Sequence, residues 1–213
     1  MTPARSKPAG REAQRLETRE RIFEAAIAEF KRNGMTGSDI NSIAAAVGVA
    51  RGTFYFHFPT KEHVAFELMR REEQSIVDDV RIALTNVSDI QALLRVVVRR
   101  VVEAEDQLGS LLFRDLLSIY FTANQLELGN VSEHPVAVLV IEELEKARRR
   151  GEVDRDLNAA NTAKFFLLGV YGLLITSRDS PDVRNVVLDD YLTFFCRGLE
   201  SGSTKPGHSQ QPQ

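Results

Sequence analysis

The chain has 213 residues, of which 43% are hydrophobic, enough to bury one large core or two small ones. Its formal charge of −3 is unevenly distributed. Residues 1–61 contain ten Lys/Arg and six Asp/Glu, a net charge of +4, whereas residues 62–213 contain 17 and 24, a net charge of −7. The N-terminal third is therefore the part of the chain that is suited to bind nucleic acid.

Cysteine content and hydropathy indicate the compartment. A single cysteine, Cys196, excludes an internal disulfide and fits a reducing cytoplasm. No apolar region opens the chain, which argues against a signal peptide. The longest apolar run, residues 165–175, is shorter than the roughly 20 residues of a membrane span. We expect a soluble, cytoplasmic protein.

The N-terminal segment is predicted to be an arm followed by a helix. Residues 1–11 are rich in Pro, Gly, Ser and basic residues and lack apolar periodicity, so we expect a disordered basic arm. Arg5, Lys7 and Arg11 either contact DNA or are simply solvated, and the solvated tail is favoured. A helix then runs from Glu12 or Glu17 to Asn33 and ends at Gly34.

The next segment has the pattern of a helix-turn-helix. Apolar residues from Ile40 to Val47 fall on one face of a short helix, with Asp39 as its N-cap and Gly48 as a left-handed terminator. A second short helix follows from about Ala50 to Phe56. On it Phe54 and Phe58 share a side, and polar side chains occupy the other. Donors on an exposed helix face suit phosphates and base edges.

The continuation of this segment, Gly-Thr-Phe-Tyr-Phe-His-Phe-Pro-Thr-Lys from Gly52 to Lys61, resembles the signature of TetR-type transcriptional regulators. The resemblance is dense from Gly34 to about Leu68 and implies that a defined set of residues contacts DNA. These are Ser38, Arg51, Gly52, Thr53, Tyr55, Phe56, His57 and Lys61. We place Arg51, Thr53 and Tyr55 in the groove, with His57 and Lys61 on phosphates. Asp39 and Ala50 depart from the family pattern, which costs phosphate contacts and a cap.

The rest of the chain is predicted to be helical, with about nine helices in an all-α fold. The expected helices are 61–84, 88–107, 111–124, 132–150, 159–177 and 180–199, followed by a disordered tail at 201–213. Together with the resemblance, this pattern predicts a helix-turn-helix domain at 12–60. A larger effector-binding and dimerisation domain is expected at 61–200.

The last two helices carry more apolar surface than one domain edge can hide. The resemblance implies that they form a four-helix bundle with a second subunit. Mid-helix glycines are costly and suggest close approach of another helix. The predicted interface residues are Phe165, Gly169, Gly172, Tyr191 and Phe195. Cys196 lies beside them and fits a packed thiol better than a redox sensor.

An effector pocket is predicted from apolar and aromatic side chains on three helices. The candidates are Phe66, Met69, Val97, Val101, Phe113, Leu117, Tyr120 and Phe121, with Asn124 as a further polar group. The alternative is that these side chains only pack the core, and residue by residue that alternative is favoured. No charged residue among them calls for an ionic ligand, so we expect a neutral, hydrophobic effector.

The function predicted is a homodimeric repressor that leaves a palindromic operator when a small apolar effector binds. An enzyme is disfavoured because the four histidines are scattered and no phosphate loop, metal-ligand cluster or activated nucleophile is present. No cofactor is expected. The alternative is a small-molecule-binding helical protein of the same fold without sequence-specific DNA binding, although Tyr55, His57 and Lys61 are all present.

Overall fold

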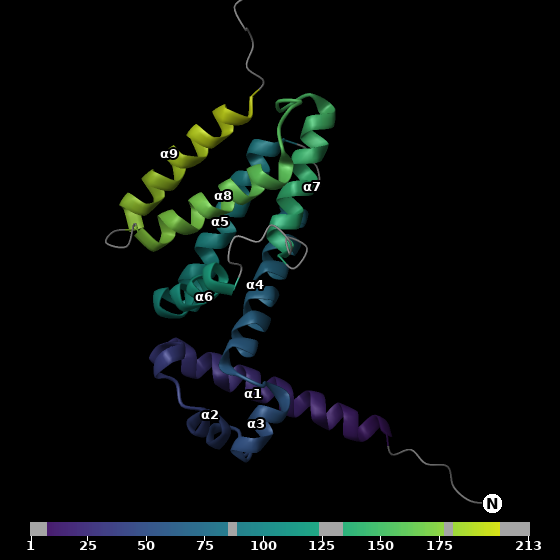
Figure 1. Cartoon of the computed structure of the whole chain (residues 1–213), viewed down its shortest axis with the longest axis vertical. Coiled ribbons are helices and arrows are strands. Elements are labelled where there is room, and N and C mark those ends of the chain that lie inside the picture. Colours follow the sequence, from purple (N-terminus) through teal and green to yellow (C-terminus); the bar gives the residue numbers. More distant parts are fainter. Residues whose placement is uncertain (1–7, 85–88, 124–133, 177–180, 201–213) are drawn as a thin grey trace, which may run out of the picture. The chain divides into compact units, whose positions relative to one another are not determined.

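The computed structural model describes residues 8–84, 89–123, 134–176 and 181–200. These residues form nine helices and, within the described ranges, no strand, which confirms the all-α prediction (Figure 1). The helices are α1 (Pro8–Gly37), α2 (Ile40–Ala46), α3 (Arg51–His57), α4 (Lys61–Ala83), α5 (Ile90–Leu108), α6 (Ser110–Ala123), α7 (Pro135–Arg150), α8 (Ala159–Thr176) and α9 (Pro181–Leu199).

The chain divides into two compact units. The first combines residues 1–71 with residues 105–126, and the second combines residues 72–104 with residues 127–213. Helix α6 therefore belongs with the helix-turn-helix, although the sequence places it in the second domain. Helices α4 and α5 each contribute to both units. The predicted domain limits at residues 12, 60 and 200 stay predictions.

Helix α1 is longer than expected. It begins at Pro8, so residues 8–11, which we expect in the disordered arm, are helical. Residues 1–7 and the predicted tail at 201–213 lie outside the described residues. The predicted break at Gly34 is confirmed, since its φ of 67° and ψ of 167° interrupt the helix. The buried stripe of α1 includes Ile22, Ala26 and Phe30.

The second unit contains a packed set of C-terminal helices, in which α8 lies against both α7 and α9. Gly151 ends α7 in the left-handed conformation, with φ 76°, as its position after three arginines predicts. By length and composition α8 could cross a membrane. Part of its surface is buried in this unit, including Phe166, Val170 and Leu174.

Candidate nucleic-acid interface

The turn between α2 and α3 is built as the sequence predicts. The side chain of Asp39 accepts from the backbone N–H of Asn41 at 3.0 Å and caps α2. Gly48 takes a left-handed φ of 71°, which reverses the chain before α3 begins. Ala50 precedes α3 and supplies no side-chain cap. Arg21 on α1 donates to the carbonyl of Val47 at 2.8 Å, which ties the end of α2 to α1.

Helix α3 has one buried side and one exposed side. Phe54 and Phe58 are fully buried, with ring centres 6.1 Å apart, and Phe58 lies 6.2 Å from the ring of Phe23 on α1. The predicted aromatic anchor is therefore confirmed. The other side of α3 carries the predicted DNA-contacting residues: Arg51, Gly52, Tyr55 and Phe56 are exposed, and Thr53 and His57 are half-buried.

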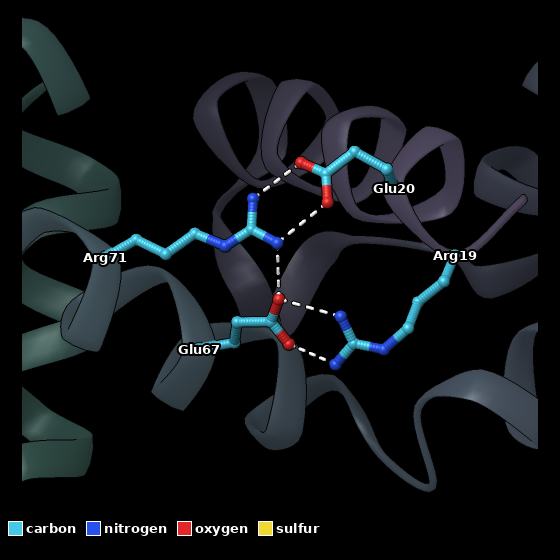
Figure 2. A network of polar contacts seen from close by, with 4 residues as sticks. All are labelled: Arg19, Glu20, Glu67 and Arg71. Atoms are coloured by element: carbon cyan, nitrogen blue, oxygen red, sulfur yellow. Dashed lines mark hydrogen bonds and ion pairs between the residues drawn. The ribbon is translucent and has the colours of Figure 1, made fainter. Parts of the chain in front are cut away.

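Four charged residues connect α1 to the first half of α4 (Figure 2). Arg19 donates to both carboxylate oxygens of Glu67, and Arg71 donates to both oxygens of Glu20 and to one of Glu67. The two guanidiniums also lie over aromatic rings, Arg19 at 4.4 Å from the centre of Phe58 and Arg71 at 4.1 Å from that of Phe23. The network therefore links α1 to α4, and its Arg19 also contacts Phe58, the residue at the C-terminal end of α3.

Sequence reasoning missed this network because its partners are far apart in the chain. Arg19 and Glu67 are 48 positions apart, and Arg71 and Glu20 are 51 apart. Only the Glu67–Arg71 pair has a local signal, an i,i+4 spacing on one helix face.

Arginines of α1 also affect the pKa of His57 on α3. Partial burial and the nearby guanidiniums of Arg15 and Arg19 lower the pKa of His57. The ring is therefore neutral in free protein at neutral pH. The ring lies near the positive charges of Arg15 and Arg19, which would attract a DNA phosphate.

Two of the predicted DNA-contacting residues, Lys61 and Ser38, already form hydrogen bonds within the protein. The ammonium of Lys61 donates to the carbonyls of Met35 and Ser38, at 2.6 Å and 3.1 Å. Ser38 is buried, and its hydroxyl donates to the carbonyl of Gly34. Both side chains therefore stabilise the turn between α1 and α2. The contacts of both residues with DNA stay predictions.

The chain matches known regulators in this same region. Residues 22–68 match the family described as bacterial regulatory proteins, tetR family. Residues 22–68 are a tetR-family DNA-binding domain. The family resemblance inferred from Gly52 to Lys61 is thereby confirmed.

Relatives extend the similarity beyond the tetR domain. The chain is 23% identical over 158 residues to the transcriptional regulator UidR of Escherichia coli, covering 74% of this chain and 80% of UidR. It is 39% identical over 56 residues to the probable acrEF/envCD operon repressor of E. coli, covering 26% of each chain. These relatives are transcriptional regulators.

A solved structure shows the same fold over nearly the whole chain. Thermus thermophilus FadR, a TetR-family repressor solved in complex with lauroyl-CoA, superposes with a TM-score of 0.63. The two chains are 24% identical, and the match covers 89% of this chain and 99% of FadR.

The predicted effector residues fall in both compact units. Val97 and Val101 are buried in the second unit, and Phe113 and Leu117 are buried in the first. Also in the first unit, Met69 is half-buried, whereas Phe66 and Phe121 are exposed. The side chain of Tyr120 and all of Asn124 lie outside the described part of the structure. A shared pocket made by these residues stays a prediction.

The described part of the second unit contains a small cavity elsewhere. Its volume is about 150 Å³. Typical ligand pockets measure roughly 300–1,000 Å³. None of the predicted effector residues lines it. The lining residues are Val80, Arg81, Leu84, Asp89, Ile90, Leu93, Leu139 and Glu143.

The predicted dimer residues have different surroundings. A Cβ atom on Gly169 would overlap the ring of Tyr191, so the close neighbour of this glycine is α9 of the same chain. The Tyr191 hydroxyl donates to the carbonyls of Phe165 and Phe166, and its ring lies 5.7 Å from that of Phe195. Phe165 itself is 63% exposed. The role of these residues in a dimer stays a prediction.

Proposed function

We propose that the protein is a homodimeric transcriptional repressor that binds a palindromic DNA operator through α3. The proposal rests on one observation: α3 lies within the tetR-family domain and has one buried and one exposed side. Its aromatic side is buried, and its donor side, with Arg51 and Tyr55, is exposed. Side chains of this kind bind phosphate oxygens and base edges. A DNA-binding role favours a regulator over an enzyme. It also favours a location in the cytoplasm, where the DNA would lie.

The apolar surface of α8 and α9 supports the homodimer. Four large apolar residues on these helices are more than half exposed: Phe165, Val183, Val186 and Phe194. Pairing with a second copy would bury them. Two α3 helices related by a two-fold axis would then reach half-sites roughly 34–36 Å apart.

A small apolar effector remains the best proposal for the ligand. Its support is the complex of the structurally similar FadR with lauroyl-CoA, a ligand whose acyl chain is apolar although its CoA group is charged. The described cavity is far smaller than a lauroyl chain with its CoA group.

A selection experiment tests the proposal directly. The wild-type chain is used to select duplexes from a random-sequence library, and binding of the enriched duplex is compared with that of a shuffled duplex. We expect an enriched palindrome, bound by a dimer in sedimentation. Equal binding of both duplexes would favour the alternative, a small-molecule-binding protein of this fold without sequence-specific DNA binding. Release of the selected duplex by lauroyl-CoA, and not by CoA alone, tests the effector class.

A further inference from the structure

The backbone of Met35 is held on both sides, within the turn of residues 34–38 that begins at the break in α1 and leads to α2. Its N–H donates to Oδ2 of Asp115 on α6 at 2.7 Å. Its carbonyl accepts from Nζ of Lys61, the first residue of α4, at 2.6 Å. Met35 is itself buried, so both bonds lie in a place where an unpaired polar group is costly.

The backbone of this turn is shaped to fit α6. Gly34 has φ 67° and ψ 167°, a conformation that only glycine adopts without strain. A Cβ atom there would lie 3.1 Å from Oδ2 of Asp115 and 3.4 Å from the side chain of Leu111, both on α6. Another bond joins α1 to the end of α5, just before α6, since Lys31 donates to the carbonyl of Gln107 at 3.0 Å.

The turn leads directly into the helix-turn-helix. The Ser38 hydroxyl closes it by donating to the carbonyl of Gly34, and the next residue, Asp39, caps α2. Lys61 bonds to the carbonyls of both Met35 and Ser38. Asp115 and Lys61 therefore hold the backbone on the two sides of the Met35 Cα, which ties the segment before α2 both to α6 and to the start of α4.

We propose that Asp115 is a positioning residue for DNA recognition, which acts by holding the Met35 N–H and, through the turn of residues 34–38, the orientation of α2 and α3. This inference rests on the proposed function. Asp115 belongs to none of the predicted DNA-contacting residues, so its effect would reach DNA only through the turn. Base contacts require the reading helix to be accurately placed, whereas binding to phosphates of any sequence tolerates displacement. Loss of the bond should therefore reduce sequence discrimination more than general DNA affinity.

The test compares Asp115→Ala, Asp115→Asn and Glu24→Ala with the full-length wild-type chain. The asparagine keeps an acceptor for the Met35 N–H. Glu24 is an exposed residue of α1 in the same unit, and its substitution removes the same charge as Asp115→Ala does. Affinities are measured for the duplex selected by the wild type and for its shuffled form, on the same preparation of each variant. Any loss of folded protein then cancels in the ratio of the two affinities.

We expect this ratio to fall by about tenfold, or about 1.4 kcal/mol, in Asp115→Ala. The ratios for Asp115→Asn and Glu24→Ala should stay within about twofold of wild type, since a twofold change is well under 1 kcal/mol. An unchanged ratio in Asp115→Ala overturns the proposal, and so does an Asp115→Asn ratio as low as that of Asp115→Ala. A wild type that does not distinguish the selected duplex from its shuffled form overturns the proposed function itself, which separates the two failures.

Discussion

The guanidinium of Arg51 donates to the hydroxyl of Tyr55 at 3.2 Å and lies 5.5 Å from the centre of the same ring. Both residues are on the exposed side of α3, one helical turn apart. A long arginine side chain loses rotamer freedom when it binds DNA, and this loss has an entropic cost. The cost is smaller if the side chain is already held by a ring before DNA binds. Tyr55 therefore orients Arg51 along the helix before DNA is present.

Substitution of Arg51 by alanine should remove base contacts and weaken binding to the selected duplex by about 1–3 kcal/mol. Tyr55→Phe keeps the ring but removes the acceptor of the Arg51 hydrogen bond, so its effect should be smaller. In the Arg51→Ala background, Tyr55→Phe should cost less than it does in the wild type, because only the contact of its own hydroxyl with DNA is then lost. Fluorescence titration of the duplex measures all four proteins. If Arg51→Ala binds like wild type, another residue reads the bases.

Glu67 is the shared acceptor of the network in Figure 2, and Glu67→Gln should destabilise the protein. The pair with Arg19 is partly exposed, at 32% and 20% of the two side chains, so we expect a loss of about 1–2 kcal/mol rather than that of a fully buried pair. Urea unfolding measures the loss, with Glu24→Gln as the control for removal of a surface charge. Equal stability of the two variants would show that the network contributes nothing measurable.

The same variant should change how stability depends on pH. Hydrogen bonds from Arg19 and Arg71 lower the pKa of Glu67, and those from Arg71 lower the pKa of Glu20. Their stabilisation is present above the ordinary glutamate pKa of about 4.5 and is lost as pH falls through the lower folded values. The difference in unfolding free energy between wild type and Glu67→Gln should therefore be constant near neutral pH and shrink below about pH 4.5. If the difference in unfolding free energy stayed constant below about pH 4.5, this prediction would be wrong.

His57 should make DNA binding depend on pH. Burial, Arg15 and Arg19 lower its pKa in the free protein, below the usual value of about 6.5. A phosphate beside the ring would raise that pKa, so the complex would bind a proton that the free protein does not. Affinity for DNA should then increase as pH falls below neutrality, and His57→Gln should remove that part of the dependence. The measurement is a pH series of duplex titrations at constant salt, and identical slopes for both proteins would place His57 away from phosphate.

Local signals in the sequence predicted much of the fold. The N-cap Asp39, the left-handed Gly48 and the Gly151 terminator each act within a few residues, and the structure confirms all three. The start of α1 was missed because its first turns are solvent-exposed and carry no apolar stripe. The helix formers Ala, Arg, Glu and Gln in residues 9–15 were the available signal.

Contacts between distant segments could not be read from the sequence. Lys61 resembles a phosphate ligand by motif, yet its ammonium is bound by carbonyls 23 and 26 positions earlier. Asp115 reaches a backbone N–H that is 80 positions away. Spacing along one helix says nothing about such partners, because tertiary packing decides them.

The two mid-helix glycines of α8 should respond in opposite ways to alanine. A Cβ at Gly169 would overlap the ring of Tyr191, so Gly169→Ala should cost about 1–3 kcal/mol through overpacking. At Gly172 the Cβ would have no neighbour within 4 Å in the same chain, so Gly172→Ala should stabilise the helix of the monomer by up to about 1 kcal/mol. Thermal and urea unfolding of the two variants provide a matched comparison on one helix. Gly169→Ala should cost less in a Tyr191→Leu background, since the ring that it meets is removed. If Gly172→Ala instead loses stability, and the loss grows with protein concentration, the space outside Gly172 is filled by a second copy of the chain.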